Sequence, residues 1–124
     1  MIGQYVRLYN DADSTSHFSD CESKLSPVDF APGLQPLFLS DPIKADQASL
    51  FGAPAGWQSD WHPSSGRHLF AVLSGEWEVT AADGESRTFA KGDVLLVEDT
   101  GGKGHKSRVI GDNDSLSILI RLLD

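Results

Sequence analysis

Hydrophobic and polar residues alternate with a period of two along the second half of the chain, which is typical of β-strands with one face in a core. The clearest example is residues 115–122, where every second side chain is apolar: Leu116, Ile118, Ile120 and Leu122. Trp77 and Val79 likewise share one face of a predicted strand over 76–80. Turn signals separate these segments at short intervals, and the Asp83-Gly84 pair suits a tight hairpin. The pattern predicts an all-β protein, either a sandwich or a barrel.

The first half of the chain is less regular. Its prolines break it into extended pieces: Pro27, Pro32, Pro36, Pro42 and Pro54. Because proline cannot donate a hydrogen bond within a sheet, it is confined to edge strands, strand starts and bulges. We therefore expect residues 1–55 to form edge strands that wrap around the barrel. The chain has no internal repeat and no long linker, so residues 1–124 are predicted to form a single domain.

Composition and charge narrow the class of protein. With 40% hydrophobic and 23% charged residues, the chain is typical of a globular domain. Its formal net charge of −8 argues against nucleic acid as a partner, because phosphates would be repelled. Cys21 is the single cysteine, and no apolar run approaches the roughly 18 residues of a membrane span. Since the N-terminal residues also lack the apolar segment of a signal peptide, we expect a cytoplasmic protein that does not enter membranes.

Three of the four histidines lie on two segments framed by glycines. His62 and His68 lie between Gly56 and Gly75, and His105 ends the sequence GDVLLVEDTGGKGH that begins at Gly92. On a helix, His62 and His68 would be about 240° apart and on different faces. The residues between them include a proline and a glycine, which also disfavour a helix. As strand ends that flank a short loop, both can point to the same side, and the three imidazoles then suit one metal ion.

These two segments resemble the two motifs of the cupin superfamily. The first motif is Gly, five residues, His, one residue, His, three or four residues, Glu, six residues, Gly, and residues 56–75 match its spacing at every step. The first metal-binding histidine of the family corresponds to His62 and the second to Ser64. The metal-binding glutamate corresponds to His68.

The second cupin motif corresponds to residues 92–109, with His105 as its metal-binding histidine. Glu98 stands where the motif has proline, Val109 stands where it has asparagine, and two extra residues separate Gly92 from His105. The resemblance implies a single cupin domain with the fold of a double-stranded β-helix, a small jelly-roll barrel with a pocket inside.

The resemblance implies a divalent transition metal held by His62, His68 and His105, with positions left open for water or substrate. Imidazole ligands suit iron, zinc, nickel or copper, and manganese is a further candidate; the sequence does not choose among them. The first hypothesis is a metal-dependent enzyme, of dioxygenase, isomerase or lyase type, that acts on a small polar or anionic organic molecule. The alternative is a non-catalytic cupin that binds or senses a small molecule, without metal if the histidines only form hydrogen bonds in the pocket.

Strand alternation predicts which neighbouring side chains share the pocket. If His68 points inward, Phe70 and Val72 do so too, and Ser107 follows in the same way from His105. An extended approach to His62 would place Gln58 and Asp60 inside, where Asp60 could move a proton as the catalytic residue. Ser64 completes the predicted substrate pocket.

The opposite face of the strand that carries His68 is also apolar: Leu69, Ala71 and Leu73. An apolar outer face needs a cover, which a second sheet or a second copy of the chain could supply. We therefore expect a homodimer.

Overall fold

A computed structural model describes residues 1–123, which form eleven β-strands and no helix. The strands are β1 (Ile2–Asn10), β2 (Ser16–Lys24), β3 (Ser26–Val28), β4 (Leu37–Leu39), β5 (Ala45–Ala53), β6 (His68–Ser74), β7 (Glu76–Ala81), β8 (Ser86–Phe89), β9 (Val94–Glu98), β10 (His105–Ile110) and β11 (Ser115–Leu122). Among these residues there is no helix that could span a membrane. The predicted all-β class is confirmed.

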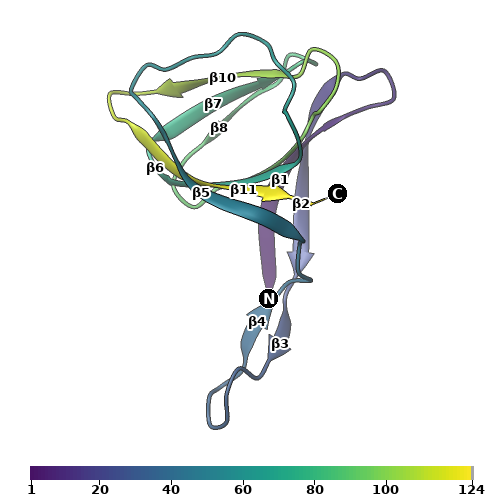
Figure 1. Cartoon of the computed structure of the whole chain (residues 1–124), viewed down its shortest axis with the longest axis vertical. Helices are drawn as coiled ribbons and strands as arrows, with labels where there is room; N and C mark the ends of the chain where they lie inside the picture. The colour runs from purple at the N-terminus through teal and green to yellow at the C-terminus, as the bar shows by residue number, and fades with distance from the viewer. Residues whose placement is uncertain (124) are drawn as a thin grey trace.

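Two sheets form the barrel (Figure 1). The larger sheet has six strands in the order β2-β1-β9-β6-β11-β5, and the smaller one has three in the order β10-β7-β8. All strand pairs are antiparallel except β1 and β9, which run parallel. Residues 56–75 and 92–109 therefore supply β6 and β9 to the larger sheet and β10 to the smaller sheet.

The hydrophobic core lies between the two sheets. The larger sheet contributes Leu8, Phe70 and Leu95, and the smaller sheet contributes Trp77 and Val79. Each of these side chains is at most 9% exposed. Burial of apolar side chains from facing sheets is the main contribution to the stability of such a fold.

The alternating segment over 115–122 forms β11, as predicted, but its apolar face does not point into the barrel. Leu119 packs against the core, and Ser117 on the same face is fully buried. Leu116 and Ile118 lie on the opposite face, where Leu116 is 41% exposed. The segment has apolar residues on both faces in its second half, so alternation alone could not assign the inner one.

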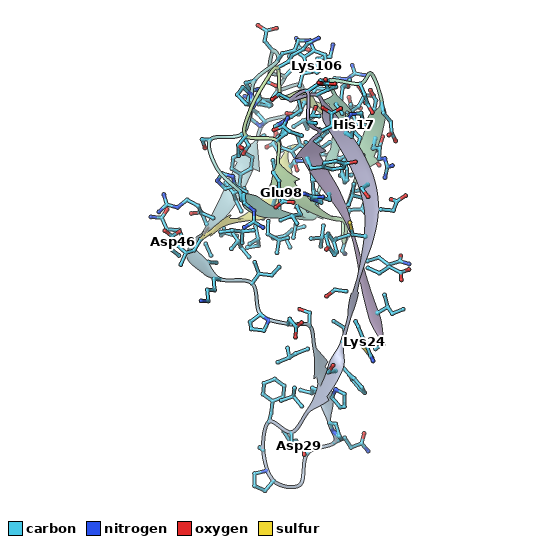
Figure 2. The ribbon with its side chains drawn as sticks, turned by 90° about the vertical axis from the view of Figure 1, so that its right-hand side faces the viewer. His17, Lys24, Asp29, Asp46, Glu98 and Lys106 are labelled. Atoms are coloured by element: carbon cyan, nitrogen blue, oxygen red, sulfur yellow. The ribbon has the colours of Figure 1, made fainter. Side chains whose placement is uncertain are left out.

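The first half departs from the prediction of proline-broken edge strands. Both β1 and β2 are nine residues long, and β1 lies inside the larger sheet, between β2 and β9. Only β2 and β5 form edges of that sheet. Four of the five prolines lie in residues 26–44, which leave the barrel as a thin arm that carries the two-stranded sheet β3–β4 (Figures 1 and 2).

Glu98 joins three parts of the larger sheet on its outer surface. Arg7 on β1 and Arg67, next to the start of β6, each donate a hydrogen bond from Nε to the Glu98 carboxylate on β9. Burial works to raise the pKa of Glu98, but the hydrogen bonds and charges of the two arginines outweigh burial, so that the pKa is lowered. The carboxylate therefore stabilises the fold in its ionised form.

We predict that Glu98→Gln lowers the free energy of unfolding by about 1–2 kcal/mol at pH 7, because it removes charge-assisted hydrogen bonds to both arginines. The pKa of Glu98 is lower in the folded protein than in the unfolded chain. The ionised carboxylate therefore stabilises the fold fully above the unfolded pKa, and this stabilisation is lost as the pH falls through the folded pKa. The difference between the variant and the wild type in urea unfolding should therefore shrink on acidification. Glu22→Gln, at an exposed position on β2, is the control and should have little effect at any pH. A Glu98→Gln variant as stable as wild type at pH 7 would contradict the prediction.

Candidate functional site

An irregular segment between β5 and β6 lies against β10 and closes one side of the barrel. One of its attachments is an antiparallel bridge, in which the His62 amide donates to the His105 carbonyl at 2.9 Å and the His105 amide donates to the His62 carbonyl at 3.0 Å. Gly104 makes this approach possible: it has φ +74°, and a Cβ there would lie 2.0 Å from the His62 carbonyl oxygen. Only glycine fits at this position without displacing the segment.

The bridge brings the His62 and His105 side chains together over a cavity inside the barrel. Their ring centroids are 4.8 Å apart. The cavity has a volume of about 340 Å³ and is mainly apolar. The residues that line it are Phe51, Trp57, His62, Pro63, Ser64, Ser65, His68, Phe70, Trp77, Val79, Leu95, Val97, His105, Ser107 and Leu119. His62 is exposed to solvent and His105 is partly buried, so the histidine pair lies near the opening.

Aromatic rings form much of the cavity wall. Phe51 and Phe70 pack edge to face at 5.9 Å, and Trp77 lies 5.8 Å from Phe70. Trp77 donates a hydrogen bond from Nε1 to Ser115 Oγ at 2.7 Å, which fixes its ring. Trp57 contacts Trp77 edge to face at 5.7 Å and remains 39% exposed. The wall therefore extends from the buried core to the solvent.

All three histidines use the same ring nitrogen for a contact with an oxygen acceptor. His62 Nδ1 lies 2.9 Å from the carbonyl oxygen of Asp60, and His68 Nδ1 lies 2.9 Å from that of Gly66. A carbonyl oxygen only accepts hydrogen bonds, so each Nδ1 carries the proton. In the neutral imidazole, the Nε2 atom then has a free lone pair, which can accept a hydrogen bond or bind a metal.

His105 makes the corresponding contact with a buried carboxylate. Its Nδ1 lies 2.5 Å from Asp99 Oδ2, and Asp99 is fully buried. Asp99 Oδ1 has no hydrogen-bond partner among the described residues, so the contact with His105 is the carboxylate's one hydrogen bond within that part of the chain. The backbone of Asp99 also accepts a hydrogen bond from the amide of Ser64, which ties the second glycine-framed segment to the first. Asp99 therefore holds the His105 ring in position.

The donor set only partly fits a metal ion. Three imidazoles with protonated Nδ1 atoms line one cavity, as a metal site of this type requires. Within residues 1–123, however, no three histidine, cysteine, aspartate or glutamate side chains lie close enough together to hold an ion. His62 and His105 are adjacent, whereas His68 would have to move toward them.

Six of the predicted site residues line the cavity: His62, Ser64, His68, Phe70, His105 and Ser107. Ser107 also lines a separate polar hollow of about 530 Å³ on the outside of the barrel. Val72 is buried in the core but is not part of the cavity lining.

Gln58 and Asp60 were predicted to share the pocket, and this is wrong for both. Both residues line the outer hollow with Glu78 and Lys106. The prediction assumed an extended strand before His62, but residues 54–67 contain only isolated bridges, so alternation does not hold there. Asp60 contributes its backbone oxygen to His62 and does not place a carboxylate in the cavity.

Sequence reasoning missed the aromatic residues Phe51, Trp57 and Trp77 of the cavity wall and the carboxylate of Asp99. Trp57 lies in the same irregular segment as Gln58, where strand alternation does not hold. Trp77 was recognised as a buried strand residue, and the cavity lies directly against it. Asp99 precedes the glycine-rich turn in the sequence DTGGKGH, and its spacing of six residues from His105 was the available signal.

We predict that Asp99→Ala changes the protonation pattern of His105, because the substitution removes the acceptor that keeps the proton on Nδ1. Long-range ¹H–¹⁵N NMR spectra should show His105 shifting from the Nδ1-H toward the Nε2-H form. His62 is an internal control and should not change, since its acceptor is a backbone oxygen. An unaltered His105 signal in the folded variant would show that Asp99 does not set the tautomer.

A model of the cupin domain family matches residues 49–120, which is more than half of the chain. A comparison with curated proteins gave no match. Similar solved structures include a cupin superfamily protein from Desulfitobacterium hafniense, with 23% identity, a TM-score of 0.48 and coverage of 82% of this chain and 79% of that one. A protein from Neisseria meningitidis has 21% identity, a TM-score of 0.46 and coverage of 81% and 84%. A predicted oxalate decarboxylase from Thermotoga maritima has 18% identity, a TM-score of 0.45 and coverage of 82% and 94%. The family match agrees with the all-β barrel and its two glycine-framed histidine segments, and the chain belongs to the cupin family.

Proposed function

We propose that this protein binds a small organic molecule in the barrel cavity, with the apolar part of the molecule against the aromatic wall and a polar group at the histidines. The observation that carries the proposal is the combination of a mainly apolar cavity of about 340 Å³ with three imidazoles in its lining. This volume falls within the range of roughly 300–1,000 Å³ that is usual for small-molecule sites.

The protonation of the histidines indicates what the polar group should be. With Nδ1 engaged by oxygen atoms, the neutral rings offer hydrogen-bond acceptors at Nε2. A ligand that donates a hydrogen bond, such as a hydroxyl compound, suits these atoms better than one that only accepts. The adjacent His62 and His105 rings can both reach one such group at the opening.

A metal centre is the second candidate. It is supported by the shared Nδ1 contacts, and above all by the buried Asp99 carboxylate behind His105, because metal-binding histidines usually donate their second nitrogen to such an oxygen. His62, His68 and His105 would hold iron, zinc, nickel, copper or manganese. Such an ion would act as a Lewis acid toward a carbonyl or carboxylate group, or bind oxygen. Turnover of dioxygenase, isomerase or lyase type belongs to this second candidate.

We predict that the cavity prefers phenol over anisole, which has the same ring but cannot donate a hydrogen bond. Titrations followed at the indole NMR signals of Trp57 and Trp77 measure both dissociation constants. The preference is the ratio of the anisole dissociation constant to the phenol dissociation constant. It should fall about tenfold in a variant with His62→Phe and His105→Phe. The same variant carries Asp99→Asn, so that no buried carboxylate is left unpaired.

The control for this titration is His17→Phe, since His17 lies outside the cavity and binds Asp11 and Asp83 on the surface. It should retain the wild-type preference. Equal binding of phenol and anisole by the wild type, or no change at either indole, would contradict the proposed mode of binding.

We predict for the metal candidate that Co²⁺ binds to the untagged protein and gives a visible absorption spectrum. His62→Ala and His68→Ala should each weaken binding at least about tenfold, since even the loss of a residue that only orients a ligand has an effect of this size. His17→Ala is the matched control and should bind like wild type. Absence of Co²⁺ binding, or an equal loss of binding in His17→Ala, would exclude the metal centre. Neither result would affect the organic-ligand proposal, which the phenol titration tests separately.

A further inference from the structure

His17, on β2, lies between two carboxylates that come from different turns. Its Nε2 atom lies 2.6 Å from Asp11 Oδ2, in the β1–β2 turn, and its Nδ1 atom lies 2.9 Å from Asp83 Oδ2, in the β7–β8 turn. Figure 2 shows His17 in the part of the barrel that lies away from the arm. An ionised carboxylate only accepts hydrogen bonds and a neutral imidazole has one N–H, so both contacts are hydrogen bonds only when the ring is protonated. The protonated His17 ring is therefore a charged link between the two turns.

The groups around His17 favour its protonated form. The hydrogen bond to Asp11 is the largest cause that raises the pKa of His17; burial opposes it, and the hydrogen bond to Asp83 and the charges of both carboxylates add to the rise. Ionisable residues also lie next to this cluster on β1 and in both turns: Arg7, Tyr9, Asp13 and Glu85. The cation among them, Arg7, is bound to Glu98, so the surroundings of His17 remain acidic.

The glycine-rich loop, residues 100–104, lies against the first of these turns. Asn10, at the end of β1, donates from Nδ2 to the Gly101 carbonyl at 3.2 Å and accepts at Oδ1 from the Gly101 amide at 3.0 Å. Ser14 packs so closely on Gly102 that a Cβ at Gly102 would lie 2.1 Å from the Ser14 carbonyl oxygen. The β1–β2 turn thus holds the loop at two neighbouring residues.

Ser16, next to His17 in the sequence, connects the second turn to the same loop. Its side chain is fully buried. Ser16 Oγ accepts a hydrogen bond from the Ala82 amide at 2.7 Å and donates one to the Gly104 carbonyl at 2.7 Å. Gly104 is the residue that permits the histidine bridge at the cavity opening. Both turns that His17 joins are therefore bonded to the loop that leads to this opening.

We propose that His17 is a proton-operated latch on the glycine-rich loop at the cavity opening. In its protonated form it holds the β1–β2 and β7–β8 turns together around the loop. When the ring releases its proton to solvent, one nitrogen becomes an acceptor that faces a carboxylate, so that one of the two contacts must open. The contact with Asp83 is the longer one, and we expect it to open first. The latch does not depend on what the cavity binds.

The latch acts on how often the loop opens. The hydrogen bonds of the loop to Asn10 and Ser16 exist in both forms, so the closed loop remains the main state and equilibrium binding in the cavity is the same, also in variants of His17. Local opening, through which a ligand would enter or leave, becomes more frequent when His17 is neutral. Since the pKa of His17 is raised in the folded protein, the latch is complete below the unfolded pKa and is lost as the pH rises through the folded pKa.

Amide hydrogen exchange, followed by NMR at a series of pH values on the full chain, tests the latch. The reporters are the Gly101 amide, which donates to Asn10, and the His105 amide, which donates to the His62 carbonyl. Protection is the ratio of the intrinsic exchange rate to the observed rate. In the wild type, the protection of both amides should be about threefold higher below the pKa of His17 than above it. His17→Gln should lack this step and should match the wild type only at high pH.

Comparison with His17→Gln isolates the latch, because the histidines of the cavity titrate in both proteins. Arg121→Gln is the matched control: it also removes a cation that binds a carboxylate, that of Asp46, which Figure 2 shows apart from His17. This control should keep the threefold step. Ring ¹⁵N NMR signals of His17 in the wild type give the pH at which it titrates. Equal protection in the wild type and His17→Gln at low pH overturns the proposal, and so does a step in protection at a pH where His17 does not titrate.

Discussion

The pair of backbone hydrogen bonds between His62 and His105 determines how the cavity is built. It joins an irregular segment to the start of β10, and thereby brings side chains from both glycine-framed segments to one opening. The bridge depends on Gly104, where any side chain would collide with the His62 carbonyl. The same segment has a second bridge to β10, between Gln58 and Arg108, so that backbone hydrogen bonds hold it beside the cavity at two places. The backbone, more than the packing of the rings, therefore sets the geometry of the site.

Oxygen acceptors around the histidines give the cavity its chemical character. The backbone of residues 60 and 66 and the buried carboxylate of Asp99 each take a hydrogen bond from an Nδ1 atom. Lone pairs at Nε2 are thus offered in a mainly apolar environment, where a single polar contact is stronger than in water. The buried position of Asp99 carries a desolvation cost, and its contact with His105 offsets part of that cost.

The sequence was sufficient to predict the all-β class and to single out three histidines that line one cavity, whereas their role as metal ligands stays a prediction. Alternation identified β7 and β11, and the two glycine-framed segments identified His62, His68 and His105, which line one cavity. Alternation failed wherever the chain was not regularly extended, which is why Asp60 was placed inside. It also could not tell which face of a two-sided apolar strand is the inner one, as β11 illustrates. The arm was not predicted, because its prolines and apolar residues indicate extended chain without indicating what that chain packs on.

The protonation of the three histidines in the wild-type protein is the most direct measure of how the site is built. Long-range ¹H–¹⁵N NMR spectra at a pH where the rings are neutral distinguish the two forms of each ring. We expect His62, His68 and His105 all to carry the proton on Nδ1 and to leave Nε2 unprotonated. A proton on Nε2 of either His62 or His105 would mean that the oxygen acceptors do not hold these rings, and that the cavity does not present the lone pairs on which its proposed binding depends.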